Sequence, residues 1–453
     1  MDALREAVRS GRLAAGVRLP SSRSLAADLG IARNTVADAY AELVAEGWLT
    51  ARQGSGTRVA QRSAAQRAVP RRAAAAGGAR RATAARKAPG RPAYDLKPGT
   101  PDLASFPRAE WLKAYRRALT AAPHEAFGYG DPRGRIELRT VLAEYLARAR
   151  GVYARPERIV LCSGFVHGLR LMGEVLRGRR VREVAVESYG LDLHWELLTR
   201  TGLRLPALPY DERGTRTEGL GAMRSVGAVL MTAAHQFPLG GALPPDRRVA
   251  AIDWARSSGG LVLEDDYDGE FRYDRQPVGA LQGLDPERVV YLGTTSKSLA
   301  PGLRLAWLVV PESLLDEVLA AKGHSDWSGS ALDQLAFAEL VGSGAYDRHV
   351  RAMRLRYRRR RDELVAAVAA QAPETRVSGI AAGLHAVLRL PPGQEQEVVR
   401  SAAWQGLAVL GLDRFRHPDV PRTQDGLVVG YATPPDSAWS GALSALCRVL
   451  PPT

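Results

Sequence analysis

The 453-residue sequence has only two cysteines, Cys162 and Cys447, and neither lies in a spacing typical of metal ligands. So few thiols argue against a disulfide framework and favour a reducing compartment. The sequence has no apolar run of about 18 residues, so we predict no transmembrane helix. The N-terminal stretch MDALREAVRSGRL is amphipathic and lacks the apolar core of a signal peptide. We therefore expect a cytoplasmic protein.

Acidic residues are missing from residues 61–92, which carry nine basic side chains. The formal net charge of the chain is +15, so the rest of the chain accounts for only +6. This segment is rich in Ala, Arg, Gly and Pro and has almost no large apolar side chain to bury, which predicts a disordered basic linker. A helix in its Ala-rich part is the alternative. The excess positive charge indicates a polyanionic partner, nucleic acid first.

The linker separates a small domain, residues 1–60, from a large one, residues 93–453. In the small domain, SSRSLAADLG begins on serine N-caps and ends on Gly30, which predicts a helix of about eight residues. IARNTVADAYAELVAEG predicts a second helix, and WLTARQGSGTRVA predicts two short strands around a tight turn. Two short helices followed by a hairpin predict a winged helix-turn-helix.

Polar side chains begin the second helix, where a recognition helix meets base edges in the major groove. Arg33 could pair with guanine, and Asn34 or Thr35 could bind a base or a phosphate. The start of the first helix suits phosphate contacts, and the thin hairpin tip could enter the minor groove. The candidate DNA-binding residues are Ser21, Ser22, Arg23, Arg33, Asn34, Thr35, Arg52, Gln53, Gly54, Ser55 and Gly56. The alternative is a helical hairpin with solvated polar tips.

The stretch LPSSRSLAADLGIARNTVADAYAELVAEGWLTARQGSGTRV resembles the GntR-type winged helix-turn-helix over about 50 residues. One departure is a first helix that looks short for that family. The resemblance implies binding to double-stranded operator DNA, which agrees with the basic linker and the positive net charge.

The large domain alternates apolar strands with stretches of helix length. This alternation predicts an α/β fold with a mostly parallel sheet covered on both faces. After about residue 330 the pattern changes to long helices with two strands, GLHAVLRL and GLVVGYA, which we interpret as a smaller α/β subdomain. The strand candidates of the sheet are RIVLCS, EVAVES, VGAVLMTA, GLVLEDD, RVVYLGT and RLAWLVV.

A lone lysine, Lys297, follows the buried strand in VYLGTTSKSLAPGLRLAW, residues 290–307. The ends of buried strands are where α/β proteins hold ligands. A lysine amine there can form a Schiff base with an aldehyde cofactor, of which pyridoxal 5′-phosphate (PLP) is the common case. The phosphate of PLP needs backbone N–H groups, hydroxyls and an arginine, its pyridine nitrogen needs a carboxylate, and its ring hydroxyl needs a hydrogen-bond partner.

The sequence offers each of these groups at the end of a strand. Asp265 and Tyr267 share strand parity and suit the pyridine nitrogen and the ring hydroxyl. His235 opens HQFPLG, which could face the ring. The candidates for the phosphate are Ser163, Gly164, Phe165, Thr294 and Arg304. Each of these candidate groups, taken alone, is more often structural than functional. Four such groups in this order, all at the ends of strands, are an improbable coincidence.

GYGDPRGRIELRTVLAEYLARARGV, EDDYDGEFRY and TTSKSLAPGLR resemble the fold-type-I, aspartate-aminotransferase-like family over residues 93–453. A GntR-type head on such a body is the architecture of the MocR family of bacterial regulators. The resemblance implies that Lys297 is the Schiff-base lysine, that Asp265 and Tyr267 contact the ring, and that Arg304 binds phosphate. It also implies a head-to-tail homodimer.

The chain departs from these families at two places. VESYGLDLHW stands where family members often read Glu-Asp-Pro-x-Tyr, so the ring-stacking aromatic is either Tyr189 or absent. GLVVGYA has no arginine where aminotransferases carry one for the substrate carboxylate, which weakens the case for efficient transamination.

Five arginines lie on one face of a predicted helix. They are either solvated or form a second surface that contacts DNA phosphates. They are Arg348, Arg351, Arg354, Arg358 and Arg361.

These features predict a cytoplasmic, nucleoid-associated, dimeric transcriptional regulator that binds PLP and is not an efficient enzyme. The effector is either PLP itself, with vitamin B6 genes as targets, or an amino compound, and the missing arginine favours PLP. One rival is a working aminotransferase with a DNA-binding head, and the missing arginine argues against it. The other is a DNA-binding protein whose body has lost PLP and only dimerises, and the intact Lys-Asp-Tyr set argues against that.

Overall fold

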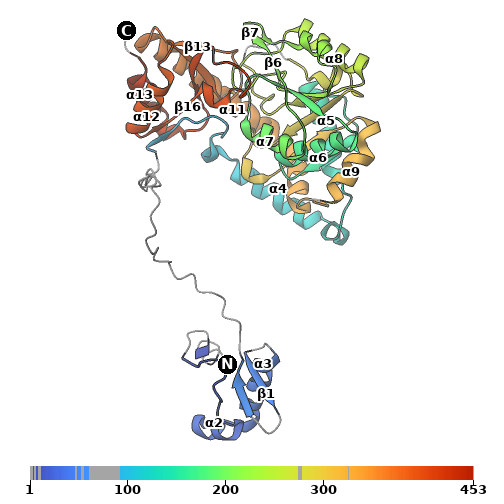
Figure 1. Ribbon diagram of the computed structural model, residues 1–453, viewed down its shortest axis with the longest axis vertical. Coiled ribbons are helices and arrows are strands. Elements are labelled where there is room, and N and C mark those ends of the chain that lie inside the picture. The colour runs from blue at the N-terminus through green and yellow to red at the C-terminus, as the bar shows by residue number, and fades with distance from the viewer. Residues whose placement is uncertain are drawn as a thin grey trace, which may run out of the picture. The chain divides into compact units, whose positions relative to one another are not determined.

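A computed structural model describes residues 4, 7–8, 12–45, 48–52, 56–60, 92–273, 278–324 and 326–451. The chain divides into two compact units, residues 1–86 and 87–453 (Figure 1). The predicted linker lies almost entirely outside the described residues. None of the described helices is both long and apolar enough to cross a membrane.

The N-terminal unit is a winged helix-turn-helix, as the sequence predicts. Ser21 caps the helix Ser22–Leu29 by accepting a hydrogen bond from the Ser24 N–H at 3.1 Å, and Gly30 ends that helix with φ of 65°. The helices and the antiparallel hairpin enclose a core that includes Val36, Tyr40 and Leu43. The elements are α2 (Ser22–Leu29), α3 (Arg33–Ala45), β1 (Leu49–Arg52) and β2 (Gly56–Val59).

The second unit is built on a seven-stranded sheet in the order β4-β12-β11-β10-β9-β5-β6. All six predicted strands are present, and only β12 runs antiparallel to its neighbours. The sheet therefore has the predicted mostly parallel character. Its strands are β4 (Ile159–Cys162), β5 (Glu183–Glu187), β6 (Ala207–Leu208), β9 (Val226–Met231), β10 (Leu261–Asp265), β11 (Val289–Thr294) and β12 (Ala306–Val309).

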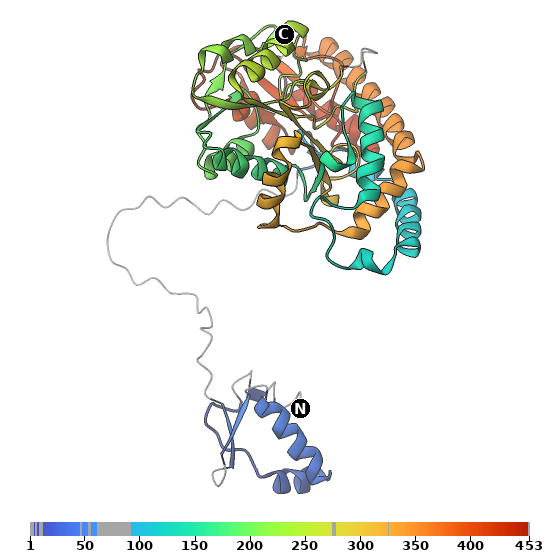
Figure 2. The same ribbon diagram turned by 90° about the vertical axis from the view of Figure 1, so that its right-hand side faces the viewer.

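Helices cover both faces of this sheet, because most of its side chains are apolar on both sides. One face packs against α6 (Phe165–Gly178), α7 (Asp192–Arg200) and α9 (Leu315–Gly323). The other face packs against α5 (Ile136–Arg150), α8 (Pro245–Ser258) and α10 (Ala331–Gly342). Outside these layers, α4 (Arg108–Ala121) lies beside α10 (Figure 2).

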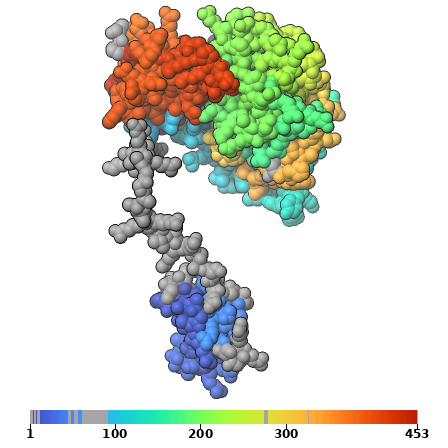
Figure 3. All heavy atoms as spheres, in the orientation of Figure 1, coloured from blue at the N-terminus to red at the C-terminus, as the bar shows by residue number. Residues whose placement is uncertain are grey.

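A smaller α/β layer adjoins the sheet layer (Figure 3). The sequence predicted two of its strands, β14 and β17, and the structure adds β13 and β16 at the edges of the antiparallel sheet β13-β14-β17-β16. The edge strands are too short to give a sequence signal. The elements are α11 (Ala345–Gln371), β13 (Arg376–Ser378), β14 (Ala386–Leu390), α12 (Glu395–Trp404), β16 (Leu410–Gly411), β17 (Asp425–Val429) and α13 (Asp436–Val449).

In the described part of the second unit, four short strands lie outside the two main sheets. β3 (Tyr94–Asp95) pairs in parallel with β15 (Leu407–Ala408), and β7 (Tyr210–Asp211) pairs with β8 (Gly214–Thr215). The first pair brings the start of the second unit to its C-terminal layer. The segment that follows β3 then reaches the carboxyl edge of the large sheet, where its Gly99 carbonyl meets Lys297.

Candidate functional site

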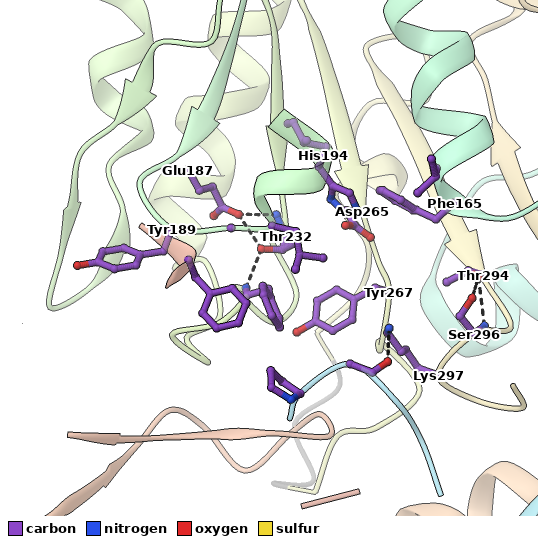
Figure 4. A pocket seen from close by; sticks show the side chains of 18 of the residues that line it. Phe165, Glu187, Tyr189, His194, Thr232, Asp265, Tyr267, Thr294, Ser296 and Lys297 are labelled. Atoms are coloured by element: carbon purple, nitrogen blue, oxygen red, sulfur yellow. Dashed lines mark hydrogen bonds between the residues drawn. The ribbon is translucent and has the colours of Figure 1, made fainter. Parts of the chain in front are cut away.

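A cavity of about 340 Å³ lies at the carboxyl ends of β5, β9, β10 and β11, beneath residues of the smaller layer (Figure 4). This is the edge of an open α/β sheet at which ligands bind. Its volume is in the usual range for a small-molecule site. Seven of the ten predicted cofactor residues line it: Phe165, Tyr189, Asp265, Tyr267, Thr294, Lys297 and Arg304.

Lys297 follows β11 and points its amine into the cavity. Its Nζ donates a hydrogen bond of 2.6 Å to the carbonyl of Gly99. Burial lowers the pKa of Lys297, and the carboxylate of Asp265 opposes that effect. A lowered pKa raises the fraction of neutral amine, which is the form that attacks an aldehyde.

Asp265 and Asp266 are adjacent carboxylates with different surroundings. Arg150 holds Asp266 through two hydrogen bonds, Nε to Oδ2 at 2.6 Å and Nη2 to Oδ1 at 2.9 Å, and the Tyr291 hydroxyl adds a third at 2.7 Å. Asp265 lines the cavity, and its Oδ1 is buried with no hydrogen-bond partner in the described structure. Burial raises the pKa of Asp265 well above its usual value, with Lys297 opposing. Such an unsatisfied acceptor is costly unless a ligand supplies a donor.

Tyr267 lines the cavity, and His235 stands directly behind it. The Tyr267 hydroxyl lies 3.1 Å from His235 Nδ1, and the same nitrogen lies 2.8 Å from Asp268 Oδ2. Burial raises the pKa of Tyr267 well above its usual value, and Asp268 adds to the effect, so the phenol keeps its proton at neutral pH. His235 therefore does not line the cavity itself; Phe237, two residues later, does.

Arg304 lies at the end of the cavity where α6 begins. Its Nη2 donates a hydrogen bond of 2.6 Å to the carbonyl of Ser163. Gly164 has φ of +93°, which strains any other residue, and a Cβ there would also displace the guanidinium of Arg304 from its present place. Nearby, the hydroxyls of Thr294 and Ser296 lie 2.8 Å apart. The N-terminus of α6, a guanidinium and two hydroxyls together form a cradle for a phosphate.

These features test whether PLP fits the residues that are present. The orphaned Asp265 oxygen suits a protonated pyridine nitrogen, and the α6 cradle suits a phosphate dianion. Lys297 lines the same cavity, and burial lowers its pKa. The donors and acceptors therefore match the cofactor.

Three predicted residues do not line the cavity: Ser163, Gly164 and His235. Ser163 donates its hydroxyl to Asp326. Tyr189 does line the cavity, but its ring extends away from Asp265 (Figure 4) and packs edge-on against Tyr210, with 6.4 Å between ring centroids.

The sequence reasoning missed several residues of the cavity, namely Glu187, His194, Thr232, His385, Leu410 and Phe415. Glu187 and Thr232 carried a usable signal, since they are polar residues at the ends of strand patterns. His194 lies within α7, and the other three come from the smaller layer. None of these four has a local sequence signal.

The N-terminal unit presents a polar surface at the start of α3. Arg33, Asn34, Thr35 and Ala37 are exposed, while Val36 is buried in the core. In α2, Ser21 and Arg23 are exposed and Ser22 is half-buried. The predicted contact residues therefore lie on the outside of the two helices, as a recognition helix and its partner require.

The hairpin tip falls largely outside the described residues, which include neither Gln53, Gly54 nor Ser55. The strands on either side pair Arg52 with Gly56. The sequence reasoning missed Arg18, which lies close to Gly56 at the base of the hairpin tip. If Gly56 had a Cβ atom, that atom would lie 3.0 Å from Arg18 Nε. Arg18 therefore places a positive charge beside the base of the tip.

The five arginines of the predicted second surface belong to α11. Arg348, Arg351, Arg354 and Arg358 are exposed and Arg361 is half-buried. Arg354 donates two hydrogen bonds to the carbonyl of Glu270, at 2.9 and 2.7 Å. Arg351 and Arg354 line a hollow of about 390 Å³ together with Arg148, Arg150 and Arg272 of neighbouring segments.

A winged helix-turn-helix joined to an α/β body with this cavity defines a DNA-binding protein with an aminotransferase-like ligand domain. Two family models match the chain accordingly. The model described as "Bacterial regulatory proteins, gntR family" matches residues 1–59, and "Aminotransferase class I and II" matches residues 94–423.

Curated relatives share this two-part organisation along most of their length. The chain is 32% identical to the Corynebacterium glutamicum "HTH-type pyridoxine biosynthesis transcriptional regulator PdxR", over 91% of this chain and 87% of that protein. It is also 32% identical to the "Probable rhizopine catabolism regulatory protein MocR" of Rhizobium meliloti, over 95% and 89%. The chain belongs to the MocR family of HTH-type transcriptional regulators.

Solved structures of aminotransferases share the fold of the second unit. An archaeal alanine:glyoxylate aminotransferase matches with a TM-score of 0.72 and 23% identity, over 79% of this chain and 90% of that one. Aspartate aminotransferase from Thermus thermophilus with maleate matches with a TM-score of 0.67 and 20% identity, over 79% and 91%. The body therefore has the fold-type-I architecture predicted from the sequence.

Proposed function

We propose that this DNA-binding regulator holds PLP in the cavity at Lys297 and that occupation of the cavity changes its affinity for an operator. The observation that carries the proposal is the buried, unpartnered Asp265 Oδ1 in a cavity with the Lys297 amine and the α6 cradle. When bound, PLP supplies an aldehyde for the lysine and an electron-withdrawing ring.

Each residue of the site then has a stated task. Lys297 supplies the amine, and burial favours its neutral form because it lowers the pKa. Asp265 would accept a hydrogen bond from the pyridinium, and Tyr267 would donate one from its phenol to the oxygen on the ring. His235 and Asp268 hold the Tyr267 hydroxyl in place. The phosphate is held by Arg304, Thr294 and the backbone at Ser163, Gly164 and Phe165, while Tyr189 borders the outer part of the cavity.

At the DNA, the start of α3 enters the major groove. Arg33, Asn34 and Thr35 read bases, while Ser21, Ser22 and Arg23 contact phosphates. The hairpin segment 52–56 contacts the minor groove. The linker arginines and the exposed arginines of α11 contact phosphates only, and these charges account for the excess of basic residues.

We propose a homodimer with head-to-tail order. Support comes from apolar side chains that remain exposed on α4 and the segment that follows it, including Leu112 (58%), Phe127 (56%) and Tyr129 (99%). A cluster of large exposed side chains marks an interaction surface. Two half-sites on DNA then match two copies of the N-terminal unit.

The effector is PLP itself, with vitamin B6 genes as targets, or an amino compound that reaches the same cavity. The printed name of the C. glutamicum relative, a pyridoxine biosynthesis regulator, supports the first. The protein acts in the cytoplasm at the nucleoid, where its DNA is. Transamination is weak, because Val428 packs in an apolar cluster on the strand where an aminotransferase has its carboxylate-binding arginine.

The test is a titration of operator binding by the apo protein, with and without PLP, beside the Lys297→Ala variant. We expect PLP to shift the operator affinity of the wild type and not that of the variant. Equal affinity with and without bound PLP would refute an effector role. Steady-state transamination of common amino acids at rates typical of enzymes, about 1–1000 per second, would move the aminotransferase interpretation to first place.

A further inference from the structure

The outer part of the cavity, away from the α6 cradle, has a largely apolar wall. Leu410 and Phe415 border it from the smaller layer, and Leu191, Trp195 and Phe237 border it from the sheet layer. Phe237 and Phe415 pack edge-on with ring centroids 5.2 Å apart. A ligand that extends past Lys297 therefore meets hydrocarbon on both sides.

The positively charged side chains of the cavity lie at its inner end, near the α6 cradle. Among the described residues that line the cavity, the arginine and lysine side chains are Arg304 and Lys297. Burial lowers the pKa of His194 to about 4 and that of His385 to about 3, so both imidazoles are neutral at pH 7. Within the part of the chain that the structure describes, no residue lining the outer wall supplies a cation for a ligand carboxylate.

Two further arginines come near this region, and neither lines the cavity. Arg416 adjoins Tyr189 through its backbone, but its Nε donates to Asp413 Oδ1 at 2.6 Å. Arg389 donates to the Ser378 hydroxyl at 3.3 Å. A carboxylate in the cavity would have to draw one of these groups away from its present partner.

Glu187 adds a buried carboxyl group to the cavity wall, and burial raises its pKa. Its Oε1 accepts from the Thr215 hydroxyl at 2.6 Å, and its Oε2 accepts from the Thr232 N–H and hydroxyl at 2.9 and 2.6 Å. Among the described residues, Thr215 and Thr232 donate these hydrogen bonds to Glu187, and both are uncharged. A ligand carboxylate would meet a buried acidic group and no counter-ion, which is a costly arrangement.

We propose that the effector compounds this cavity accepts are primary amines with an apolar body and no carboxylate, and that amino acids are disfavoured. The amine end lies at Lys297 and the apolar body lies between Leu410, Phe415 and Phe237. This inference rests on the proposed function, because it assigns a ligand class to the same PLP-loaded cavity. In an ordinary aminotransferase the site binds the carboxylate of the substrate. In this cavity we expect a carboxylate to weaken the binding of the ligand.

The experiment uses two pairs of probes that differ only in the carboxylate: 2-phenylethylamine against L-phenylalanine, and 3-methylbutylamine against L-leucine. Binding to the PLP-loaded full chain is measured by calorimetry, with the PLP content of each sample determined separately. We expect each amine to bind at least about tenfold more tightly than its amino acid, a difference of about 1.4 kcal/mol.

A matched pair of variants tests the physical reason. Leu410 is half-buried at the cavity wall, so a longer polar side chain has room to reach solvent. Leu410→Arg should tighten amino-acid binding by about tenfold or more, whereas Leu410→Gln, which adds polarity without charge, should not. The readout is a change of preference, and the Gln variant controls for simple loss of packing.

The outcomes separate the two proposals. Equal or tighter binding of the amino acids to PLP-loaded wild type overturns the ligand class and leaves the PLP site intact. Failure of either amine to bind the PLP-loaded chain also overturns it. Absence of PLP from samples incubated with the cofactor counts instead against the proposed function.

Discussion

Lys297 donates a 2.6 Å hydrogen bond to the carbonyl of Gly99, a residue 198 positions earlier in the sequence. Gly99 has φ of +104°, a conformation that favours glycine. The contact gives the lysine amine a fixed place in the cavity before any ligand arrives. It ties the first segment of the second unit to the turn after β11.

Replacing Lys297 by alanine should abolish covalent retention of PLP. In the wild type we expect a visible absorption that borohydride removes, leaving a pyridoxyl group on the peptide that contains residue 297. The alanine variant should show neither signal. Mass spectrometry after reduction makes the assignment, and a reduced pyridoxyl group on another lysine of the variant would show that Lys297 is not the attachment site.

Asp265→Asn should weaken PLP binding without destabilising the apo protein. The asparagine keeps a polar group but removes the negative charge that pairs with the pyridinium. Because Asp265 Oδ1 is buried without a partner and burial raises the pKa of this carboxyl, the apo variant should be as stable as wild type or more so. Thermal unfolding of the apo forms and PLP titration measure both effects. A marked loss of apo stability would identify Asp265 as a structural residue.

Glu270 should make stability fall as the pH rises. Burial, with Asp266 adding to it, raises the pKa of Glu270 to about 7 from an ordinary 4.5. Between these values the folded state keeps a proton that the unfolded state has lost, so the free energy of unfolding decreases with pH and levels off above 7. Each pKa unit corresponds to about 1.4 kcal/mol, so the full effect is at most about 3.5 kcal/mol.

Glu270→Gln should remove this dependence, since Tyr346 can still donate its hydroxyl to the amide oxygen. We expect the variant to gain stability relative to wild type at pH 8 and to change little at pH 4.5. Denaturant unfolding at both pH values measures the difference. Glu144→Gln, at an exposed position of α5, is the control, and equal effects of the two substitutions would refute the argument.

Arg33→Ala should cost about 1–3 kcal/mol of operator binding and relax the preference at one base position. The reason is that Arg33 lies exposed at the first residue of α3, where a guanidinium can pair with a guanine edge. Binding to a panel of operator variants gives the measurement. Arg23→Ala is the control, expected to weaken all sequences alike, and identical profiles for the two variants would remove Arg33 from base recognition.

The basic residues of the linker and of α11 should affect the salt dependence of DNA binding and not its sequence preference. Replacing Arg351 and Arg358 together by glutamine should lower the slope of log affinity against log salt by about two, one unit for each lost phosphate contact. Arg71 and Arg72 of the linker should behave in the same way. Salt series on operator and scrambled duplexes provide the test.

Arg170→Gln supplies the control for these variants, because Arg170 is an exposed α6 arginine paired with Glu174 at 2.8 Å. An unchanged slope after removal of the linker charges would make that segment a tether only. The excess positive charge of the chain would then need another explanation.

Much of the fold followed from local patterns. Apolar runs such as those of β10 and β11 predict buried strands, because a strand covered on both faces has no polar side to alternate with. Ser21 and Gly30 marked the ends of α2, since a serine oxygen and a left-handed glycine satisfy the end groups of a helix. The short edge strands β13 and β16 gave no such signal, because two or three residues carry too little periodicity.

By itself the sequence determined the two-part organisation, the α/β class and the strand ends at which polar side chains gather. Strand parity already favoured Asp265 over Asp266, and only the tertiary structure showed what occupies Asp266, since its partner Arg150 comes from a helix 116 residues earlier. Likewise, Phe237 lines the cavity and His235 stands behind Tyr267. Leu410 and Phe415 enter the site from a separate layer. Local sequence sets how a segment folds, whereas the partner of a buried charge depends on which distant segments the packed core brings together.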